Sequence, residues 1–188
     1  MTERSGPAWC AKFPGSNKLE DLEADFQAKA RAFIDAVKAA GAAVLISATH
    51  RPAERAYLMH FACKVAGYRD KQQVFHQLPP KDVPPMQGVD IDWTHAGDTG
   101  KAIAGAKAMV TAYNIAYPAA LVSNHTRRKA IDMTITFAGT LHVKNKAGVL
   151  VAVKADMARQ HPDLWPVGAS YGCKKLPSDK PHWSSDGH

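Results

Sequence analysis

A strict alternation of apolar and polar residues runs through Ile131-Asp132-Met133-Thr134-Ile135-Thr136-Phe137. A period of two is typical of a β-strand that buries one face and exposes the other. The four apolar members are expected to face the core, and the three polar members to point away from it. The sequence therefore predicts a half-buried strand that carries an acidic side chain, Asp132, on its open face.

Working outward from this strand, the remaining patterns predict an α+β fold. Helical spacing of apolar residues and proline or glycine at the boundaries indicate helices. Short apolar runs beside turn residues indicate strands. The predicted helices are 19–40, which stops at Gly41, Pro52–Ala66, Asp98 to about Ala116 with Asp98 as its cap, and a short one near 154–160. The predicted strands are Ala43–Ser47, expected to be buried, Leu141–Val143 and Val149–Val153, and paired prolines exclude a long helix from 67–97.

Length and composition indicate one globular domain. The chain has 188 residues, of which 46% are hydrophobic and 22% charged, so it can bury a core and is not expected to be disordered. We expect a single domain over 1–188, with an N-terminal helical part of about 1–41 and a metal-binding core of about 42–188. The predicted architecture is a small, mainly antiparallel sheet with flanking helices and a metal cleft.

The three cysteines exclude two classes of small domain. Cys10, Cys63 and Cys173 lie far apart and form no Cys-x-x-Cys pair, which argues against a disulfide framework and a thiolate zinc finger. The N-terminal residues lack the apolar stretch of a secretory signal, and no apolar run is long enough to span a membrane. We therefore expect a protein made in the cytoplasm without a signal peptide and without membrane insertion.

The formal net charge of +7 predicts an anionic partner. Nucleic acid, an anionic membrane surface and the acidic bacterial envelope all fit, and charge alone does not choose among them. A solvated basic surface is the plainer interpretation of the same residues.

Two local clusters contain the residue types that bind a catalytic zinc. Such a site takes three protein ligands from His, Asp or Glu and leaves one position open for water. The first cluster is Ser123-Asn124-His125 with Asp132 seven positions after the histidine, and the second is Asp179-Lys180-Pro181-His182. Either Asp179 or His182 can bind the metal while the other stands beside its water. A third cluster, Asp90 to His95, is interpreted as a cleft-lining or structural segment, because it lies in the irregular stretch and contains no complete ligand set.

Both clusters resemble the signatures of a known family. Ser123-x-His125, with Ala130 and Asp132 after it, resembles the Ser-x-His-x-x-Gly-x-Ala-x-Asp signature of the zinc D-Ala-D-Ala carboxypeptidase and dipeptidase family. That family includes the D,D-dipeptidases of vancomycin resistance and phage L-alanyl-D-glutamate endolysin peptidases. Asp179-x-x-His182-Trp183 is similar to its second signature. The resemblance extends from about residue 45 to the C-terminus, and Arg128 stands where the family has glycine.

The resemblance implies a role for each matching residue. One Zn²⁺ per chain would be held by His125, Asp132 and His182. Asp179 would be the general base. Arg51, which matches the arginine before the family's second helix, would stabilise the oxyanion or hold a substrate carboxylate. The two remaining expected substrate contacts are Ser123, a hydrogen-bonding group, and Trp183, an apolar wall of the cleft or else a core residue.

The function implied is a zinc metallopeptidase that cleaves bacterial peptidoglycan stem peptides or cross-links. The bond is open between L-Ala-D-Glu and D,D linkages. The chain would act in the periplasm or cell wall, either as an endolysin released by a holin or as an effector moved by a secretion system, in which case an immunity protein is an expected partner. A D-Ala-D-Ala carboxypeptidase has the same chemistry. The alternative from another class is a non-catalytic basic module that binds cell wall or nucleic acid; for the peptidase we expect a monomer and no nucleic acid.

Overall fold

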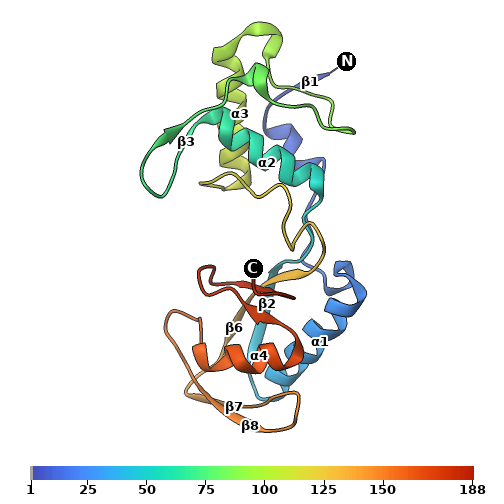
Figure 1. Ribbon diagram of the computed structural model, residues 1–188, viewed down its shortest axis with the longest axis vertical. Helices are drawn as coiled ribbons and strands as arrows, with labels where there is room; N and C mark the ends of the chain where they lie inside the picture. The colour runs from blue at the N-terminus through green and yellow to red at the C-terminus, as the bar shows by residue number, and fades with distance from the viewer. Residues whose placement is uncertain (1) are drawn as a thin grey trace. The chain divides into compact units, whose positions relative to one another are not determined.

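The computed structural model describes residues 2–188, and its chain forms two compact units. Unit 1 consists of the N-terminal segment that ends at Pro14 together with Pro52–Val122. Unit 2 consists of Gly15–Arg51 and Ser123–His188. Helices combine with mainly antiparallel sheets, so the predicted α+β class is confirmed (Figure 1). The α-helix near residue 30, assigned above to the N-terminal part, belongs to the unit that holds the predicted metal ligands.

Unit 2 is built on a four-stranded sheet with the strand order β2-β6-β10-β9. The bounds of its strands and helices are β2 Ala43–Ala48, β6 Ala130–Thr136, β9 Lys174–Lys175, β10 His182–Ser184, α1 Ala24–Ala39 and α4 Trp165–Tyr171. The strands β7 (Thr140–Lys144) and β8 (Leu150–Lys154) form a separate antiparallel hairpin, and two 3₁₀ turns cover Leu19–Asp21 and Pro162–Leu164. The predicted strand at 131–137 and the predicted hairpin strands are confirmed.

The register of the central strand β6 decides which side chains share a face. β6 pairs antiparallel with β10, so that His182 lies opposite Asp132 and Trp183 lies opposite Ile131. Residues directly opposite each other in a sheet project to the same side. Asp132 and His182 therefore share the open face, while Trp183 and Ile131 share the buried one.

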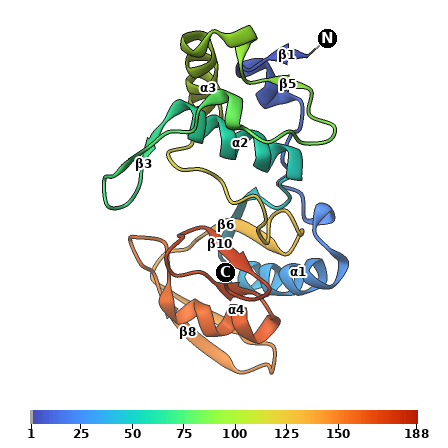
Figure 2. The ribbon, with the colours of Figure 1, turned by 45° about the horizontal axis from the view of Figure 1, so that its top comes forward.

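The buried face of this sheet packs against α1 and α4, which lie on the same side of it (Figure 2). The α1 helix begins after Glu23, whose carboxylate accepts hydrogen bonds from the backbone N–H groups of Asp25 and Phe26. Its apolar stripe buries Phe33 completely, and the Phe33 ring lies 5.0 Å from the Trp183 ring between centroids. The helix predicted for 19–40 is present, but it begins five residues later than predicted, at Ala24, because Leu19–Asp21 forms a separate 3₁₀ turn.

The strand β2 differs from its prediction in burial. Its residues alternate between exposed and half-buried, and the Leu45 side chain is 70% exposed. The reason is its position: β2 is the edge strand of the sheet, paired on one side only, with β6. The strand itself was predicted correctly, but the expectation that it is buried is wrong.

Unit 1 is organised around two helices, α2 (Ala53–Ala66) and α3 (Thr99–Tyr113). Asp98 caps α3 by accepting a hydrogen bond from Lys101 N–H, and Asn114 ends it in the left-handed conformation. Both helices confirm their predictions, α3 ending about three residues early. Between and before them lie short elements: β1 Glu3–Arg4, β3 Tyr68–Arg69, β4 Phe75–His76, β5 Ile91–Asp92, and 3₁₀ turns at Pro7–Ala11, Pro80–Asp82 and His95–Gly97.

The predicted short helix near 154–160 is wrong. Residues 155–160 form turns instead, because the Asp156 carboxylate accepts hydrogen bonds from the backbone N–H groups of Ala158 and Gln160. Arg159 adopts a positive φ of 56°, which no α-helix contains. The helix lies later, as α4, with a proline in its first turn and Gly172 after its last residue.

The cysteines and the hydrophobicity of the helices bear on two classes of protein that the sequence argued against. The three cysteines are free thiols, in agreement with the absence of a disulfide framework. Among residues 2–188, no helix has the length and apolar character needed to cross a bilayer.

Candidate metal centre

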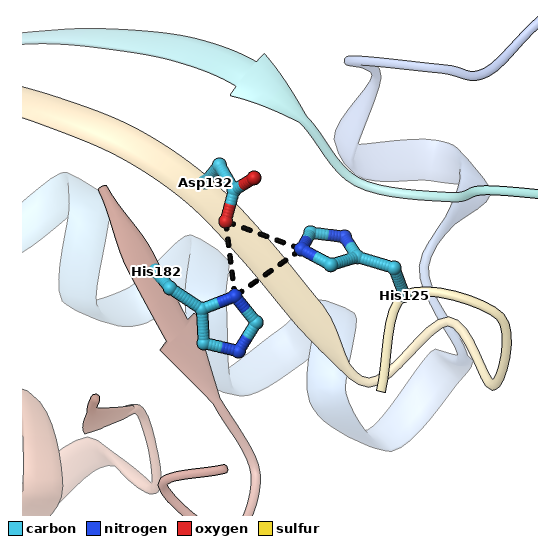
Figure 3. Close-up of side chains that lie close together, drawn as sticks. All are labelled: His125, Asp132 and His182. Atoms are coloured by element: carbon cyan, nitrogen blue, oxygen red, sulfur yellow. Dashed lines mark hydrogen bonds and ion pairs between the residues drawn. The ribbon is translucent and has the colours of Figure 1, made fainter. Parts of the chain in front are cut away.

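Three predicted ligands converge on one point of unit 2. His125 Nε2 lies 3.1 Å from Asp132 Oδ1 and 3.2 Å from His182 Nδ1, and the third side, from His182 Nδ1 to Asp132 Oδ1, is 3.0 Å. Figure 3 shows the three side chains pointing toward one another from separate segments of the chain. This group can hold a metal ion.

The triangle has the size that a tetrahedral metal site requires. Ligand atoms of such a site lie about 3.3 Å apart when the metal–ligand bonds are about 2.0–2.1 Å long. The three sides of the triangle are slightly shorter than that value. The donor set therefore fits three corners of a tetrahedron, with the fourth corner left to a non-protein ligand.

Hydrogen bonds to backbone carbonyls select the ring tautomers of both histidines. His125 Nδ1 lies 2.8 Å from the carbonyl oxygen of Thr49, and His182 Nε2 lies 3.1 Å from that of His188. A carbonyl oxygen only accepts, so the proton of each neutral ring sits on the nitrogen that faces the carbonyl. The other nitrogen, which faces Asp132, then offers a lone pair, as metal-binding histidines do.

Three acceptor atoms this close together need a positive charge between them. In the neutral tautomers, lone pairs of His125 and His182 and an ionised oxygen of Asp132 face the same point. Burial raises the pKa of Asp132, but hydrogen bonds and charge from the two histidines outweigh it and hold the pKa well below its usual range. Burial lowers the pKa of His182, and the Asp132 carboxylate more than reverses this, so the net pKa is raised. Both directions favour an ionised Asp132 beside a positive charge, which a proton on the histidines or a metal ion can supply.

The turn that carries His125 is fixed by local hydrogen bonds. Ser123 and Thr126 bond reciprocally: Ser123 N–H donates to the Thr126 hydroxyl, and that hydroxyl donates to the Ser123 carbonyl. The turn closes where Lys129 N–H donates to the Asn124 carbonyl at 2.7 Å. Arg128, at the position where glycine was expected, has a φ of 62°. The loop thus keeps the left-handed backbone that glycine favours, although an arginine occupies it.

Asp179, the predicted general base, lies on the exposed turn between β9 and β10. Its backbone carbonyl accepts from His182 N–H at 3.1 Å, which fixes the spacing between the two residues. Its carboxylate is not part of the metal-binding group, but its charge contributes to the raised pKa of His182. Asp179 is therefore near enough to His182 to act on it electrostatically.

Lys175 stabilises this turn through hydrogen bonds to its backbone carbonyls. The side chain is buried, and its ammonium group donates to the carbonyl oxygens of Leu176 at 2.6 Å, of His182 at 3.1 Å and of Asp179. Burial lowers the pKa of Lys175, and the charges of Asp179 and Asp132 oppose that effect. A buried cation thus fixes the backbone of both the predicted base and one ligand.

Two further predicted residues lie on the same unit. The backbone N–H of Arg51 donates to the His125 carbonyl at 3.2 Å, so Arg51 lies beside the turn that carries His125. The Ser123 hydroxyl accepts from Thr126 N–H at 3.4 Å, so it takes part in the turn itself. Their proposed contacts with a substrate stay predictions.

Trp183 requires a correction. Its side chain is 2% exposed and belongs to the core cluster of unit 2, packed against Phe33. The alternation of β10 explains this, because a residue next to His182 in a strand projects to the opposite face. Of the two roles expected for Trp183, the structure supports the core residue and not the wall of a substrate cleft.

The competing cluster from Asp90 to His95, expected to line a cleft or to be structural, is held together by its own hydrogen bonds. The Asp92 carboxylate accepts from Thr94 N–H, from the Thr94 hydroxyl and from His95 N–H. These bonds hold a turn. The cluster is not among the metal-binding groups of the described residues.

Four residues of the site were missed by the sequence analysis. Thr49 and His188 act through backbone carbonyls, a role that residue type does not reveal. Lys175 resembled any other basic residue of the chain. Asn124 lies between two residues of the first signature, but no role was assigned to it. Its burial, with 8% of the residue exposed, indicates a structural role and is visible only in the structure.

No protein-family model, no curated protein and no solved structure matches the chain.

Proposed function

We propose that this chain is a zinc-dependent peptidase that cleaves the peptide part of bacterial peptidoglycan. The observation that carries the proposal is the convergence of His125, Asp132 and His182 in a triangle of 3.0–3.2 Å sides. Two imidazoles and a carboxylate are a ligand set that zinc accepts in hydrolases. Structural zinc sites are closed by four protein ligands, so a three-ligand set supports a catalytic site over a structural one.

Zn²⁺ bound at this position would polarise a carbonyl group and lower the pKa of a water molecule. The protein's own residues would do the rest. Asp179 would take a proton from the attacking water and deliver it to the leaving amine. Arg51 would bind the oxyanion or a substrate carboxylate, a task suited to a permanently charged planar donor. Ser123 would donate a hydrogen bond to the substrate.

Charge near the ligands supports an anionic substrate. Arg127, Arg128 and Lys129, on the turn that follows His125, are all exposed, and Lys180 is exposed on the turn that carries Asp179. Stem peptides contain carboxylates, and the wall that contains them is anionic. Basic side chains on both turns would raise the local concentration of such a polymer.

Mass spectrometry of defined muropeptides tests the reaction, the bond and the base together. The wild type should release a new fragment from stem or cross-linked peptides, and Asp179→Ala should release it at least about 100-fold more slowly, the scale of a lost general base. Asp163→Ala, at another exposed aspartate of unit 2, is the matched control and should retain the wild-type rate. A wild type that cleaves none of these peptides in the presence of zinc rules out the substrate assignment.

The identity of the fragments distinguishes the remaining alternatives. Loss of terminal D-Ala indicates a carboxypeptidase, and a cut between L-Ala and D-Glu indicates an endolysin-type enzyme. Zinc binding without any cleavage would favour the non-catalytic binding module. Whether a holin or a secretion system delivers the enzyme stays a prediction, and so does a monomeric state.

Zinc binding itself is tested by Asp132→Asn, which keeps the shape of the side chain and removes its charge. We expect zinc affinity to fall by more than about 100-fold, beyond the 10–100-fold that follows loss of an outer hydrogen-bond partner. Competition with a chromogenic chelator measures the change. Asp35→Asn, on the exposed side of α1, is the control and should bind zinc as the wild type does. Equal affinity in both variants would contradict the assigned ligands.

A further inference from the structure

The last residues of the chain fold back onto the metal ligands. We call Ser184–His188 the tail turn; the C-terminal end lies beside β10 and β6 (Figure 2). The backbone carbonyl of His188 accepts a hydrogen bond from His182 Nε2 at 3.1 Å and another from Asn124 Nδ2 at 2.7 Å. We propose that the tail turn is a positioning element of the metal centre, which orients His182 and couples it to the turn that carries His125.

The tail turn is held in its shape by its own side chains. Asp186 Oδ1 accepts from His188 N–H at 3.0 Å and from the Ser184 hydroxyl at 3.2 Å. The same hydroxyl accepts from Gly187 N–H at 2.9 Å, and Ser184 is fully buried. The His188 carbonyl is therefore placed by a network of short-range bonds rather than by chance contact of a loose end.

Asn124 connects this network to the other histidine ligand. Its amide nitrogen donates to Asp186 Oδ1 at 2.6 Å and to the His188 carbonyl at 2.7 Å. An amide NH₂ group has two protons, so both are committed to the tail turn. The residue that follows Asn124 in the chain is the ligand His125. A second tie is the bond from Ser185 N–H to the Lys129 carbonyl, at 3.0 Å, on the far side of the same turn.

The arrangement gives the two histidines different outer partners. The outer ring nitrogen of His125 faces the carbonyl of Thr49, directly after β2, whereas the outer ring nitrogen of His182 faces the carbonyl of His188 in the tail turn, at 3.1 Å. Partners of this kind fix the ring orientation and the tautomer, and their removal lowers metal affinity by about 10–100-fold. Loss of the tail turn should therefore weaken metal binding although all three ligands remain.

Two variants test this inference with zinc alone as the probe. Deletion of residues 186–188 removes both the carboxylate and the carbonyl that hold Asn124 and His182. Asn124→Asp keeps the side-chain shape and turns two donated bonds into repulsion between acceptors. Both should lower zinc affinity by about 10–100-fold in a chelator competition. Asn17→Asp, at an exposed asparagine of unit 2, is the matched control and should leave the affinity within about twofold of the wild type.

A second readout needs no metal. In the metal-free wild type, nitrogen-15 NMR should show a His182 ring with its proton on Nε2, protected from exchange by the His188 carbonyl. The deletion should abolish that protection, while thermal unfolding confirms that the unit remains folded. Unchanged zinc affinity together with an unchanged His182 signal in both variants would overturn the inference.

The inference rests on the metal-binding half of the proposed function, and the two fail in distinguishable ways. If the wild type binds no zinc, the proposed function fails, whereas the His182 signal still reports on the tail turn. If the wild type binds zinc and the variants bind it equally well, the metal centre stands and the tail turn has no part in it.

Discussion

Arg128 shows how a single residue can keep a backbone conformation that its side chain disfavours. Its φ of 62° lies in the left-handed region, while Arg127, beside it, is not among the positive-φ residues. A left-handed backbone costs an ordinary residue about 1–2 kcal/mol, and more for a β-branched one. The turn tolerates this because bonds at both ends fix it: the Arg128 carbonyl accepts from Glu23 N–H at 2.9 Å, and Arg128 N–H donates to the His125 carbonyl at 3.2 Å.

Substitutions at these two neighbouring arginines should have opposite effects on the free energy of unfolding. Arg128→Gly should be neutral or stabilising within about 1 kcal/mol, and Arg128→Val should cost about 1 kcal/mol or more. At Arg127 the order should reverse, with glycine costing about 0.5–1 kcal/mol and valine less. Urea denaturation monitored by circular dichroism measures all four. The same order at both positions would show that the left-handed backbone is not under strain.

At the residue scale, the sequence predicted the three residues that could hold a metal ion, but not the residues that orient them. Asp132 was predicted because alternation and side-chain chemistry are both local properties, and the spacing from His125 and the second signature added the two histidines. The outer partners could not be found in this way. Thr49 and His188 contribute backbone carbonyls, and which carbonyl meets a ring nitrogen depends on contacts across 76 residues for Thr49 and His125.

At the scale of the elements, α4 packs closely against β10 because a glycine, Gly168, faces the Trp183 ring. At Gly168 an added Cβ would collide with the Trp183 ring and would lie 2.9 Å from the Cys173 carbonyl oxygen. Glycine is needed here for space, because the tryptophan on the buried face of β10 packs directly against the helix. At Gly100, in the first turn of α3, an added Cβ would meet only Asp98 Oδ1, at an ordinary contact distance of 3.5 Å.

The same substitution should therefore have opposite effects in the two helices. Gly168→Ala should lower the free energy of unfolding by about 1–3 kcal/mol, as overpacking does. Gly100→Ala should raise it by up to about 1 kcal/mol, because alanine is the better helix former. Thermal unfolding of both variants provides the measurement. Stabilisation by Gly168→Ala would contradict the described packing of α4 on Trp183.

His60 makes α2 sensitive to pH. Burial lowers the pKa of His60; the hydrogen bond from its Nδ1 to the Ala119 carbonyl, at 2.7 Å, opposes this, and the charge of Lys64 adds to it. Because the pKa of the folded state lies below that of the unfolded chain, the unfolded chain binds the proton first as the pH falls. The contribution of His60 to stability is thus complete above the unfolded pKa of about 6.5 and declines below it.

His60→Gln should flatten this dependence, since glutamine can still donate to the Ala119 carbonyl but does not titrate. Between pH 7.5 and pH 5.5, the metal-free wild type should lose more unfolding free energy than the variant does. Urea titrations at the two pH values give the comparison. A variant that loses as much as the wild type would assign the dependence to other groups.

Elements were predicted well where their signals are local and poorly where a side chain competes with the backbone. Asp98 and Gly41 marked helix ends that the structure contains, with α1 and α3 displaced by only a few residues. The helix expected near 154–160 failed because the Asp156 carboxylate takes the N–H groups that a helix would use. The edge position of β2 depends on the order of strands in the sheet, which no local pattern encodes.

At the scale of the whole molecule, each unit has its own hydrophobic core. The core of unit 1 surrounds α2 and α3, and that of unit 2 lies between α1, α4 and the sheet. All three ligands belong to unit 2. A metal ion stabilises whatever structure must be folded in order to bind it.

Zinc should therefore protect one unit more than the other in hydrogen exchange. At a free zinc concentration 100-fold above Kd, the stabilisation is about 2.7 kcal/mol, so amides of β6 and α1 should exchange up to about 100-fold more slowly. Amides of α2 and α3 should change little. Exchange followed by mass spectrometry with and without zinc measures this. Equal protection of both units would mean that the chain unfolds as one cooperative body.

The interleaving of the two units along the chain sets an order of assembly during translation. The edge strand β2 emerges from the ribosome early, but its partner β6 is synthesised only after the whole of Pro52–Val122. Leu45, for example, cannot pair with Thr134 until then. Pairings between distant residues form slowly, while the α2–α3 pair is local and can form as it emerges. Nascent unit 1 can thus fold while β2 still lacks its neighbour. The candidate metal centre lacks one of its three predicted ligands until His182 has been synthesised, so it cannot form while only unit 1 is complete.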